Sequence, residues 1–269
     1  MHVSRLFVYP VKSAAGIEVQ AADIDDFGFH LDRRWMFVRN GSFVTQREDA
    51  RLTRVRPKFS DGGVSISAEG MPELVLPTFD RSTMQAPIWD DIVGVHDCGD
   101  DVADWLTTLL GEATRLVFLP DSSFRRIDPR YSPDERRVSL ADGYPFLLVS
   151  DASVQEICRR TGLELSVRRF RPNIVVGGAP YPHAEDDWRR ITIADQTFSI
   201  VKPCARCVVT TIDPDTGIAG PEPLRTLATY RKVGSKVMFA QNMIHDAPGR
   251  IAVGDAIAVV EGKPRDPSA

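Results

Sequence analysis

The feature that most constrains the fold is the regular interruption of short apolar runs by residues that favour tight turns. The apolar residues 35–38 lead into Asn40-Gly41. A type I′ turn needs positive φ at both central positions, and Asn-Gly accepts this at little cost, so the pair predicts a hairpin. Asp61-Gly62-Gly63 and Glu69-Gly70 predict two more. We therefore expect short strands and turns from residue 3 to about residue 95.

Helical periodicity is confined to three segments. The clearest covers residues 100–110, where apolar residues recur at helical spacing after Asp100 as N-cap, and Gly111 gives a stop signal. A second helix is expected from a cap at Ser150-Asp151 to about Gly162. A short third helix is expected near residues 224–228.

The remaining apolar runs are predicted strands, because they are rich in β-branched residues and end at turn formers. They cover residues 3–10, 17–25, 114–119, 144–149, 174–176, 188–200, 208–212 and 251–260. Strands and helices do not alternate as in a doubly wound α/β sheet. The chain is therefore predicted to be mainly β and β-barrel-like, with about three helices. The aperiodic residues 120–137 form a long loop between two halves.

Composition limits the possible functions. The 269 residues carry a formal charge of -4 at pH 7, whereas general nucleic-acid and anionic-membrane binders present basic surfaces. The first ten residues do not form a signal peptide, and no run approaches the roughly 20 apolar residues of a membrane span. We therefore expect a cytosolic, cytoplasmic protein that binds neither nucleic acid nor membrane. In such a chain a local cluster of cations indicates a specific anion site.

Cysteine spacing points to one place in the chain. The four cysteines are at positions 98, 158, 204 and 207, too few and too uneven for a disulfide framework. Cys158 falls on the apolar side of a predicted helix and Cys98 directly precedes another, so both are expected to be structural. Only Cys204 and Cys207 have a spacing typical of chemistry, with Arg206 between them. Neighbouring cations favour the thiolate, which is the nucleophilic and metal-binding form.

Three interpretations of this pair remain open from the residues alone. A structural zinc site needs four ligands, but the chain offers no second cysteine pair and no histidines at ligand spacing. A thioredoxin-like dithiol would begin a helix, whereas Val208 to Ile212 favour a strand. These arguments weaken both chemical interpretations. The third interpretation is a pair of inert thiols in a β-turn, and spacing alone does not exclude it.

Cations stand at several predicted strand–loop junctions, namely at Lys12, Arg33, Arg171, Lys202 and Arg206. Arg171-Pro172-Asn173 combines a guanidinium, which suits bidentate phosphate binding, with an amide donor. Lys12-Ser13 offers similar donors, and no Walker or dinucleotide glycine motif is present. The residues thus predict an anionic, phosphate-bearing ligand near a soft thiolate. Other arginines are expected to be solvated surface charges: Arg34, Arg168, Arg169, Arg189 and Arg190.

Four ordered motifs resemble those of MOSC-domain proteins. They are Tyr9-Pro10-Val11-Lys12-Ser13, Asp32-Arg33-Arg34-Trp35, Phe170-Arg171-Pro172-Asn173-Ile174-Val175 and the stretch from Cys204 to Gly217. Within this family the chain is similar to the mitochondrial amidoxime-reducing components and their bacterial relatives. The resemblance runs from about residue 3 to residue 260. It implies a MOSC N-terminal β-barrel region at 1–119, a MOSC β-barrel domain at 120–262 and a disordered tail at 263–269.

The resemblance also implies a molybdenum cofactor, a molybdopterin whose metal is held by dithiolene sulfurs and one protein cysteine. In the family the second thiol of the pair is this ligand, which implies Cys207, and a thiolate suits so soft a metal site. Other implied cofactor-binding residues are Lys12, Ser13 and Arg33 at the pterin, and Arg171, Asn173 and Arg206 at the phosphate end.

The activity implied by the resemblance is a two-electron reduction of N-hydroxylated compounds, such as amidoximes, N-hydroxyguanidines and hydroxylaminopurines. Asp142 matches an acidic residue of the family at the substrate pocket and is the second implied catalytic residue beside Cys207, although Gly143-Tyr144 after it departs from the family pattern.

The resemblance also bears on the electron donor. We expect neither the fused ferredoxin cysteines of some bacterial relatives nor the targeting and anchor segment of the mitochondrial ones, since the 269 residues contain no match to either. Electrons are therefore expected from a separate reductase or iron–sulfur protein. The alternative is a MOSC protein that binds the cofactor or carries sulfur without reductase turnover.

Overall fold

The computed structural model describes residues 1–60, 63–78, 83–132 and 134–263. The predicted turn residues Asp61-Gly62 and the predicted tail from residue 264 onward lie outside this set. The three α-helices are α1 (Asp100–Leu110), α2 (Asp151–Thr161) and α3 (Leu224–Tyr230). The short 3-10 segments are η1 (Ala50–Arg54), η2 (Val167–Phe170), η3 (Ala184–Asp187) and η4 (Val208–Thr211).

The strands account for most of the regular structure, so the prediction of a mainly β chain with about three helices is confirmed. They are β1 (His2–Val8), β2 (Ile17–Val19), β3 (Ala21–Asp25), β4 (Gly28–Phe29), β5 (Trp35–Arg39), β6 (Ser42–Phe43), β7 (Arg56–Ser60), β8 (Gly63–Ala68), β9 (Met71–Val75), β10 (Thr83–Ile88), β11 (Asp91–Asp97), β12 (Arg115–Phe118), β13 (Phe146–Ser150), β14 (Ile174–Gly177), β15 (Trp188–Ile193), β16 (Gln196–Arg206), β17 (Lys232–Val233), β18 (Lys236–His245), β19 (Gly249–Ala252) and β20 (Ile257–Gly262).

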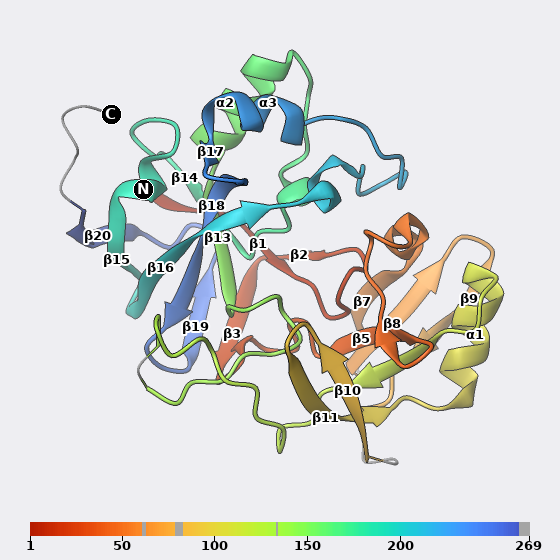
Figure 1. Cartoon of the computed structure of the whole chain (residues 1–269). Helices are drawn as coiled ribbons and strands as arrows, with labels where there is room; N and C mark the ends of the chain where they lie inside the picture. Colours follow the sequence, from red (N-terminus) through yellow and green to blue (C-terminus); the bar gives the residue numbers. More distant parts are fainter. Residues whose placement is uncertain (61–62, 79–82, 133, 264–269) are drawn as a thin grey trace.

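The largest sheet is a nearly closed barrel (Figure 1). Its nine strands follow the order β2-β1-β14-β13-β18-β16-β15-β20, with β17 paired to β18. An isolated bridge joins His2 in β1 to Ala256, which directly precedes β20. The Ile257 N–H also donates to the Met1 carbonyl at 2.9 Å. The N-terminal strand therefore completes a barrel whose remaining strands, apart from β2, come from beyond residue 145.

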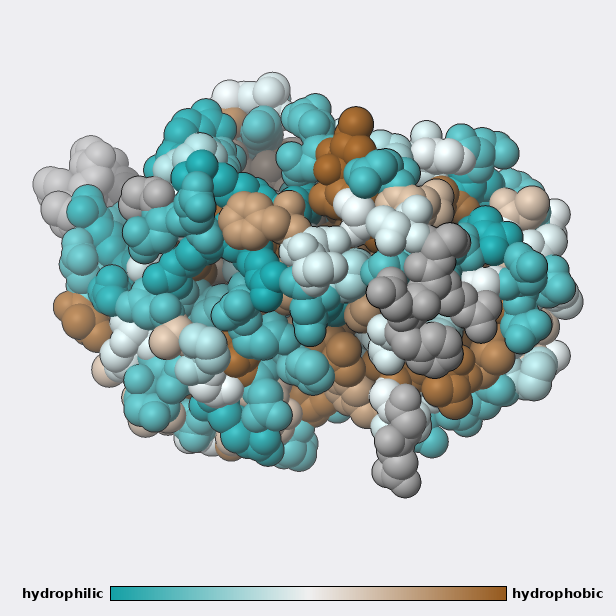
Figure 2. All heavy atoms as spheres, turned by 90° about the horizontal axis from the view of Figure 1, so that it is seen from below, coloured by the Kyte–Doolittle hydropathy of each residue, from teal (hydrophilic) through white to brown (hydrophobic). Residues whose placement is uncertain are grey.

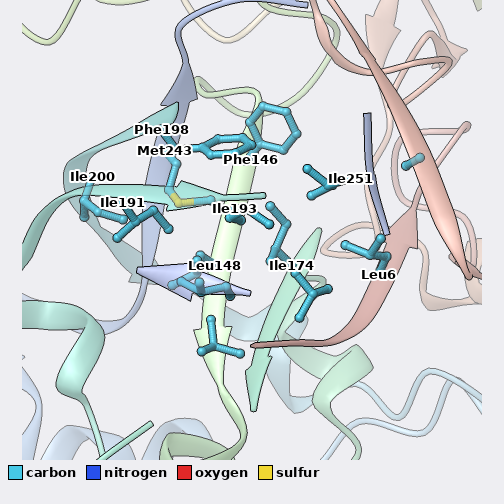
Figure 3. Packing of buried hydrophobic residues seen from close by; sticks show 14 of the residues in the cluster. Leu6, Phe146, Leu148, Ile174, Ile191, Ile193, Phe198, Ile200, Met243 and Ile251 are labelled. Atoms are coloured by element: carbon cyan, nitrogen blue, oxygen red, sulfur yellow. The ribbon is translucent and has the colours of Figure 1, made fainter. Parts of the chain in front are cut away.

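The barrel interior is filled by alternate side chains of its strands (Figure 3). Large apolar residues from β1, β13, β14, β15, β16 and β18 pack together there, and Ile251 of β19, from a neighbouring sheet, joins them. Phe146 lies between Phe29 and Phe198, with ring centroids 5.0 and 5.4 Å away and near-perpendicular planes. Edge-to-face packing of this kind favours one arrangement of the rings. The strand that begins at Phe146 is thus firmly fixed.

The N-terminal half forms two smaller sheets, in the orders β10-β11-β12-β5-β6 and β7-β8-β9. Helix α1 packs against them through Val102, Trp105 and Leu106. A third small sheet, β19-β3-β4, pairs the first 30 residues with the last strands of the chain. Strands from opposite ends of the sequence therefore hold the two halves together.

Predictions that rested on local turn and cap chemistry are confirmed. Asn40 and Gly41 have φ values of 52° and 75° and join β5 to β6. The Ser150 side chain accepts a hydrogen bond from the Ser153 N–H at the start of α2, and Gly162 ends this helix in the left-handed conformation. Helix α1 begins at Asp100 as expected, but its N-cap is Gly99 without a side-chain cap bond.

Four other predictions are wrong. The single strands expected over 17–25 and 251–260 are each two strands, because the chain bends there from one sheet into another. Residues 208–211 form η4 instead of a strand. Arg34 is not a solvated surface charge: it is 3% exposed, and its Nε donates to the Leu119 carbonyl at 3.0 Å.

On the face shown in Figure 2, hydrophilic residues predominate and hydrophobic residues form separate patches. Among the residues that the structure describes, no helix is both long enough and apolar enough to cross a membrane.

Candidate functional site

One pocket contains all eight residues to which the family resemblance gave a role. It lies between the two halves of the chain and is also lined by Phe146 and Leu147 at the start of β13. The N-terminal half contributes Lys12, Ser13 and Arg33, and the second half contributes Asp142, Arg171, Asn173, Arg206 and Cys207. Residues almost two hundred positions apart in the sequence thus meet at one place.

A group of interacting side chains, which we call the inner wall, consists of Tyr9, Asp32, Arg33, Arg171 and Asn173, of which the last three line the pocket. The guanidinium carbons of Arg33 and Arg171 each lie 4.4 Å from the centroid of the Tyr9 ring. Arg33 Nη1 donates to Asn173 Oδ1 at 3.0 Å and to Asp32, and Asp32 accepts from the Tyr9 N–H at 2.8 Å. Every member is thus held by at least one other.

Burial determines the electrostatics of the inner wall. Burial raises the pKa of Tyr9 to about 12, although the charges of Arg171 and Arg33 act in the opposite direction. Burial, and then the like charge of Arg33, lower the pKa of Arg171 to about 10. Arg171 therefore remains charged at neutral pH. Two guanidinium groups held so close together favour binding of an anion.

Lys12 and Asp142 form an ion pair across the middle of the pocket. Lys12 is 5% exposed, and its Nζ lies 2.6 Å from Asp142 Oδ1 and 2.9 Å from the Leu140 carbonyl. Desolvation lowers the pKa of Lys12, against the charge of Asp142. The surrounding protein also disfavours ionised Asp142, but the charge and hydrogen bond of Lys12 outweigh this and hold the pKa of that carboxyl well below its usual range. Asp142 is therefore a carboxylate at neutral pH.

Each thiol of the Cys204–Cys207 pair faces its own guanidinium. Arg206 Nη1 lies 3.0 Å from Cys204 Sγ, and Arg47 Nη2 lies 3.4 Å from Cys207 Sγ. Strand β16 ends at Arg206, so Cys207 is the first residue after the strand and the N-cap of η4. Both thiols therefore lie beside a cationic side chain.

Arg47 and Trp89 form an exposed outer rim that sequence reasoning missed. The Arg47 guanidinium carbon lies 4.7 Å from the centroid of the Trp89 ring, and both residues line the pocket. Glu48 fixes the turn before Arg47, since its carboxylate accepts from the Thr45 N–H and hydroxyl at 2.9 and 2.6 Å. The Thr-x-x-Glu pattern at 45–48 was a local signal for this turn, but not for its place beside Cys207.

Backbone conformation sets the pocket apart from the rest of the molecule. Four of the nine non-glycine residues with positive φ in the described chain line it, namely Ser13, Arg33, Trp89 and Arg171. Such conformations cost free energy and persist where the surrounding structure enforces them, often at functional sites. The concentration of strain here supports a functional role for this pocket.

Several candidate residues lie elsewhere. The Lys202 ammonium lies 5.1 Å from the centroid of the Tyr131 ring, and Lys202 does not line the pocket. Arg168 and Arg169 pair with Asp215 and Asp213 and so hold the turn after η4. Cys98 is 4% exposed within the hydrophobic core. In the described part of the chain, no group of three or more His, Cys, Asp or Glu side chains is placed to hold a metal ion.

The pocket lining includes five cationic side chains, Lys12, Arg33, Arg47, Arg171 and Arg206, and one carboxylate, Asp142. This positive balance contrasts with the chain's net charge of -4. In addition, Arg206 Nε is buried without a hydrogen-bond partner among the described residues. A buried donor without a partner is costly, and an anionic ligand would satisfy it. A soft cysteine sulfur and an excess of cations together fit a metal complex that carries a phosphate.

Two family models match the chain. The MOSC N-terminal beta barrel domain matches residues 1–113, and the MOSC domain matches residues 135–258. The chain therefore belongs to the MOSC family and contains both of these domains. This agrees with the resemblance read from its four motifs.

Curated relatives point to a group within this family. Mitochondrial amidoxime-reducing component 1 of Mus musculus is 34% identical over 278 residues, which cover 95% of this chain and 81% of the relative. Mitochondrial amidoxime reducing component 2 of Bos taurus is 36% identical, over 85% of this chain and 72% of the relative. Molybdenum cofactor sulfurase of Danio rerio is 31% identical over 91% of this chain but only 32% of that longer protein.

Proposed function

We propose that this protein is a molybdenum-cofactor-dependent reductase of N-hydroxylated compounds that receives electrons from a separate donor protein. The observation that carries the proposal is the meeting of the Cys207 thiol with five cationic side chains in one strained pocket. The names of its relatives, which include amidoxime-reducing components and a molybdenum cofactor sulfurase, support the same conclusion.

The residues of the pocket divide into roles that suit such a cofactor. Cys207 would supply the protein ligand to the metal. Arg171, Asn173 and Arg206 would bind the phosphate end, and Lys12, Ser13 and Arg33 would bind the pterin. When bound, the cofactor supplies a metal centre that can deliver two electrons to a substrate. The protein contributes binding, orientation and charge.

Asp142 has a positioning role in this proposal. Reduction of an N–OH group consumes two electrons and two protons and yields N–H and water. Because Lys12 keeps the pKa of Asp142 low, this carboxylate is a poor proton donor at neutral pH. Its side chain is 72% exposed, so it can accept hydrogen bonds from the amino group of an amidoxime. Asp142 would thus orient the substrate, while Lys12 orients Asp142.

The two cysteines provide a matched test of the metal ligand. We expect Cys207→Ser to lose molybdenum and Cys204→Ser to retain it, although both thiols line the pocket and each contacts a guanidinium. The measurement is the molybdenum content of protein purified from a host that makes the cofactor. Equal molybdenum content in the two variants would contradict the single-ligand assignment.

Turnover separates the proposed reductase from the alternative of a cofactor or sulfur carrier. The purified protein should reduce benzamidoxime with an artificial electron donor, and Cys207→Ser should not. A protein that contains molybdenum but reduces no N-hydroxylated compound would support the carrier. A metal-free protein from a cofactor-competent host would contradict both functions.

A further inference from the structure

The tip of the β10–β11 hairpin carries a partly exposed tryptophan. Ile88 pairs with Asp91, so Trp89 is one of the two residues at the turn, with φ of 54°. This left-handed conformation is strained for a bulky side chain. Trp89 is also 40% exposed, whereas Trp35, Trp105 and Trp188 are at most 6% exposed. A strained and exposed tryptophan adds little to stability, which indicates a role in binding.

Neighbouring side chains hold the indole in place at the pocket. The Phe43 ring lies 5.0 Å from the Trp89 ring at an interplanar angle of 70°. Arg47 stacks at 4.7 Å, and the Lys12 ammonium lies 5.7 Å from the ring centroid. Figure 1 shows the hairpin rising from the lower edge of the molecule toward its middle. The indole is therefore part of a supported surface and not a loose side chain.

Arg47 connects this surface to the proposed metal ligand. One end of its guanidinium is 3.4 Å from Cys207 Sγ, and the same group stacks on Trp89. A substrate whose N–OH group reaches the metal bound by Cys207 would therefore have the rest of its body beside Arg47 and Trp89. Indole and guanidinium groups both present flat faces, which attract flat conjugated rings.

We propose that Trp89 and Arg47 form a stacking surface that selects planar, conjugated N-hydroxylated substrates, such as aryl amidoximes and N-hydroxylated nucleobases, over small aliphatic ones. This inference rests on the proposed reductase function and names the substrate class of the same site. Trp89 is a specificity-determining residue here, because it contacts the body of the substrate and not the group that is reduced.

The kinetic test compares benzamidoxime with acetamidoxime, which share the reacting group and differ in the ring. Trp89→Leu removes the aromatic face on which the ring would stack. We expect this loss of binding to lower kcat/KM for benzamidoxime about tenfold. The value for acetamidoxime should stay within about twofold, and Trp89→Phe should recover most of the loss. Ile92→Ala is the matched control, since Ile92 is 73% exposed on the same hairpin and does not line the pocket.

A binding test without turnover uses the fluorescence of the enzyme in the absence of an electron donor. Benzamidoxime should quench the wild-type emission and acetamidoxime should not, because the other three tryptophans are buried. The quenching should disappear in Trp89→Phe, which identifies Trp89 as its source.

The two tests distinguish failure of this inference from failure of the reductase function. Quenching by benzamidoxime with no turnover of either compound would overturn the reductase and leave the stacking surface standing. Turnover with equal losses for both compounds in Trp89→Leu would overturn the stacking surface, as would a wild-type emission that benzamidoxime does not quench.

Discussion

The inner wall and the outer rim contain the same kind of contact in two different settings. In the inner wall Arg33 and Arg171 each lie 4.4 Å from the Tyr9 ring, and in the outer rim Arg47 lies 4.7 Å from the Trp89 ring. Tyr9 is 1% exposed, whereas Trp89 is 40% exposed. The chemistry of the pair is therefore not what distinguishes the two regions.

The difference lies in the hydrogen bonds around each arginine. Arg33 donates to Asp32, to Asn173 Oδ1 and to the Arg171 carbonyl, so its position is fixed without a ligand. Arg47 has the Cys207 thiol and the exposed indole as its neighbours. The comparison teaches that one arginine–aromatic contact can serve as structure where it is buried, and remain available to a ligand where it is exposed.

The largest expected difference in stability is between two variants that each remove an arginine, one from the inner wall and one from the outer rim. Arg33→Ala leaves the buried Asp32 without its ion-pair partner, which should lower the free energy of unfolding by about 3–5 kcal/mol. Arg47→Ala at the exposed rim should change it by no more than about 0.5 kcal/mol. Urea unfolding of both variants measures this. Similar losses in the two would remove the distinction between wall and rim.

Gly16→Ala should lower the free energy of unfolding by an intermediate amount, because it disturbs the inner wall and not the outer rim. A Cβ at Gly16 would lie 2.4 Å from Tyr9 Cε1, so the ring that both arginines contact would have to move. We expect the free energy of unfolding to fall by about 2 kcal/mol, which is typical of overpacking. Gly94→Ala is the control, because its Cβ would meet nothing closer than 3.7 Å. Thermal unfolding of both variants checks this, and a neutral Gly16→Ala would show that the Tyr9 position is not fixed.

Asp142→Asn should lower the free energy of unfolding by less than Arg33→Ala or Gly16→Ala does, and its effect should depend on pH. The folded-state pKa of Asp142 lies below its unfolded value, so the ion pair stabilises the fold above about pH 4 and this contribution is lost as the pH falls. Because the Asp142 side chain is 72% exposed, we expect Asp142→Asn to lower the free energy of unfolding by less than about 1 kcal/mol. Unfolding of wild type and variant between pH 7 and pH 3 measures the difference. The difference in free energy of unfolding between wild type and variant should shrink as the pH falls. A difference that grows toward pH 3 would contradict the stabilising role of the ion pair.

Local chemistry explains which parts of the fold could be predicted. The Asn40-Gly41 hairpin and the Ser150 cap depend on residues a few positions apart, so the sequence specified them. Val208 to Thr211 were predicted as a strand from β-branched composition. In the structure Thr210 and Thr211 hydroxyls donate to the carbonyls three residues earlier, at 3.0 and 2.7 Å, and the segment turns into η4. Side-chain bonds to the backbone thus overrode propensity.

Distant contacts explain what could not be predicted. Arg34 is buried because Leu119 and Asp121, far along the chain, accept its hydrogen bonds. Trp89 lies on a hairpin whose position relative to Cys207 depends on the packing of whole sheets. The inner wall was found because its residues form compact motifs, whereas the rim was missed because Arg47 and Trp89 stand alone in the sequence.

Closure of the barrel by the first strand has a consequence for the making of this protein. Strand β1 pairs with β14, more than 160 residues later, and His2 bridges to Ala256. During translation the N-terminal segment must therefore wait, without all of its final partners, until the residues up to Ala256 have left the ribosome. The pocket is lined by residues as late as Asn242, so any prosthetic group that needs the whole pocket must be inserted after this residue has been made.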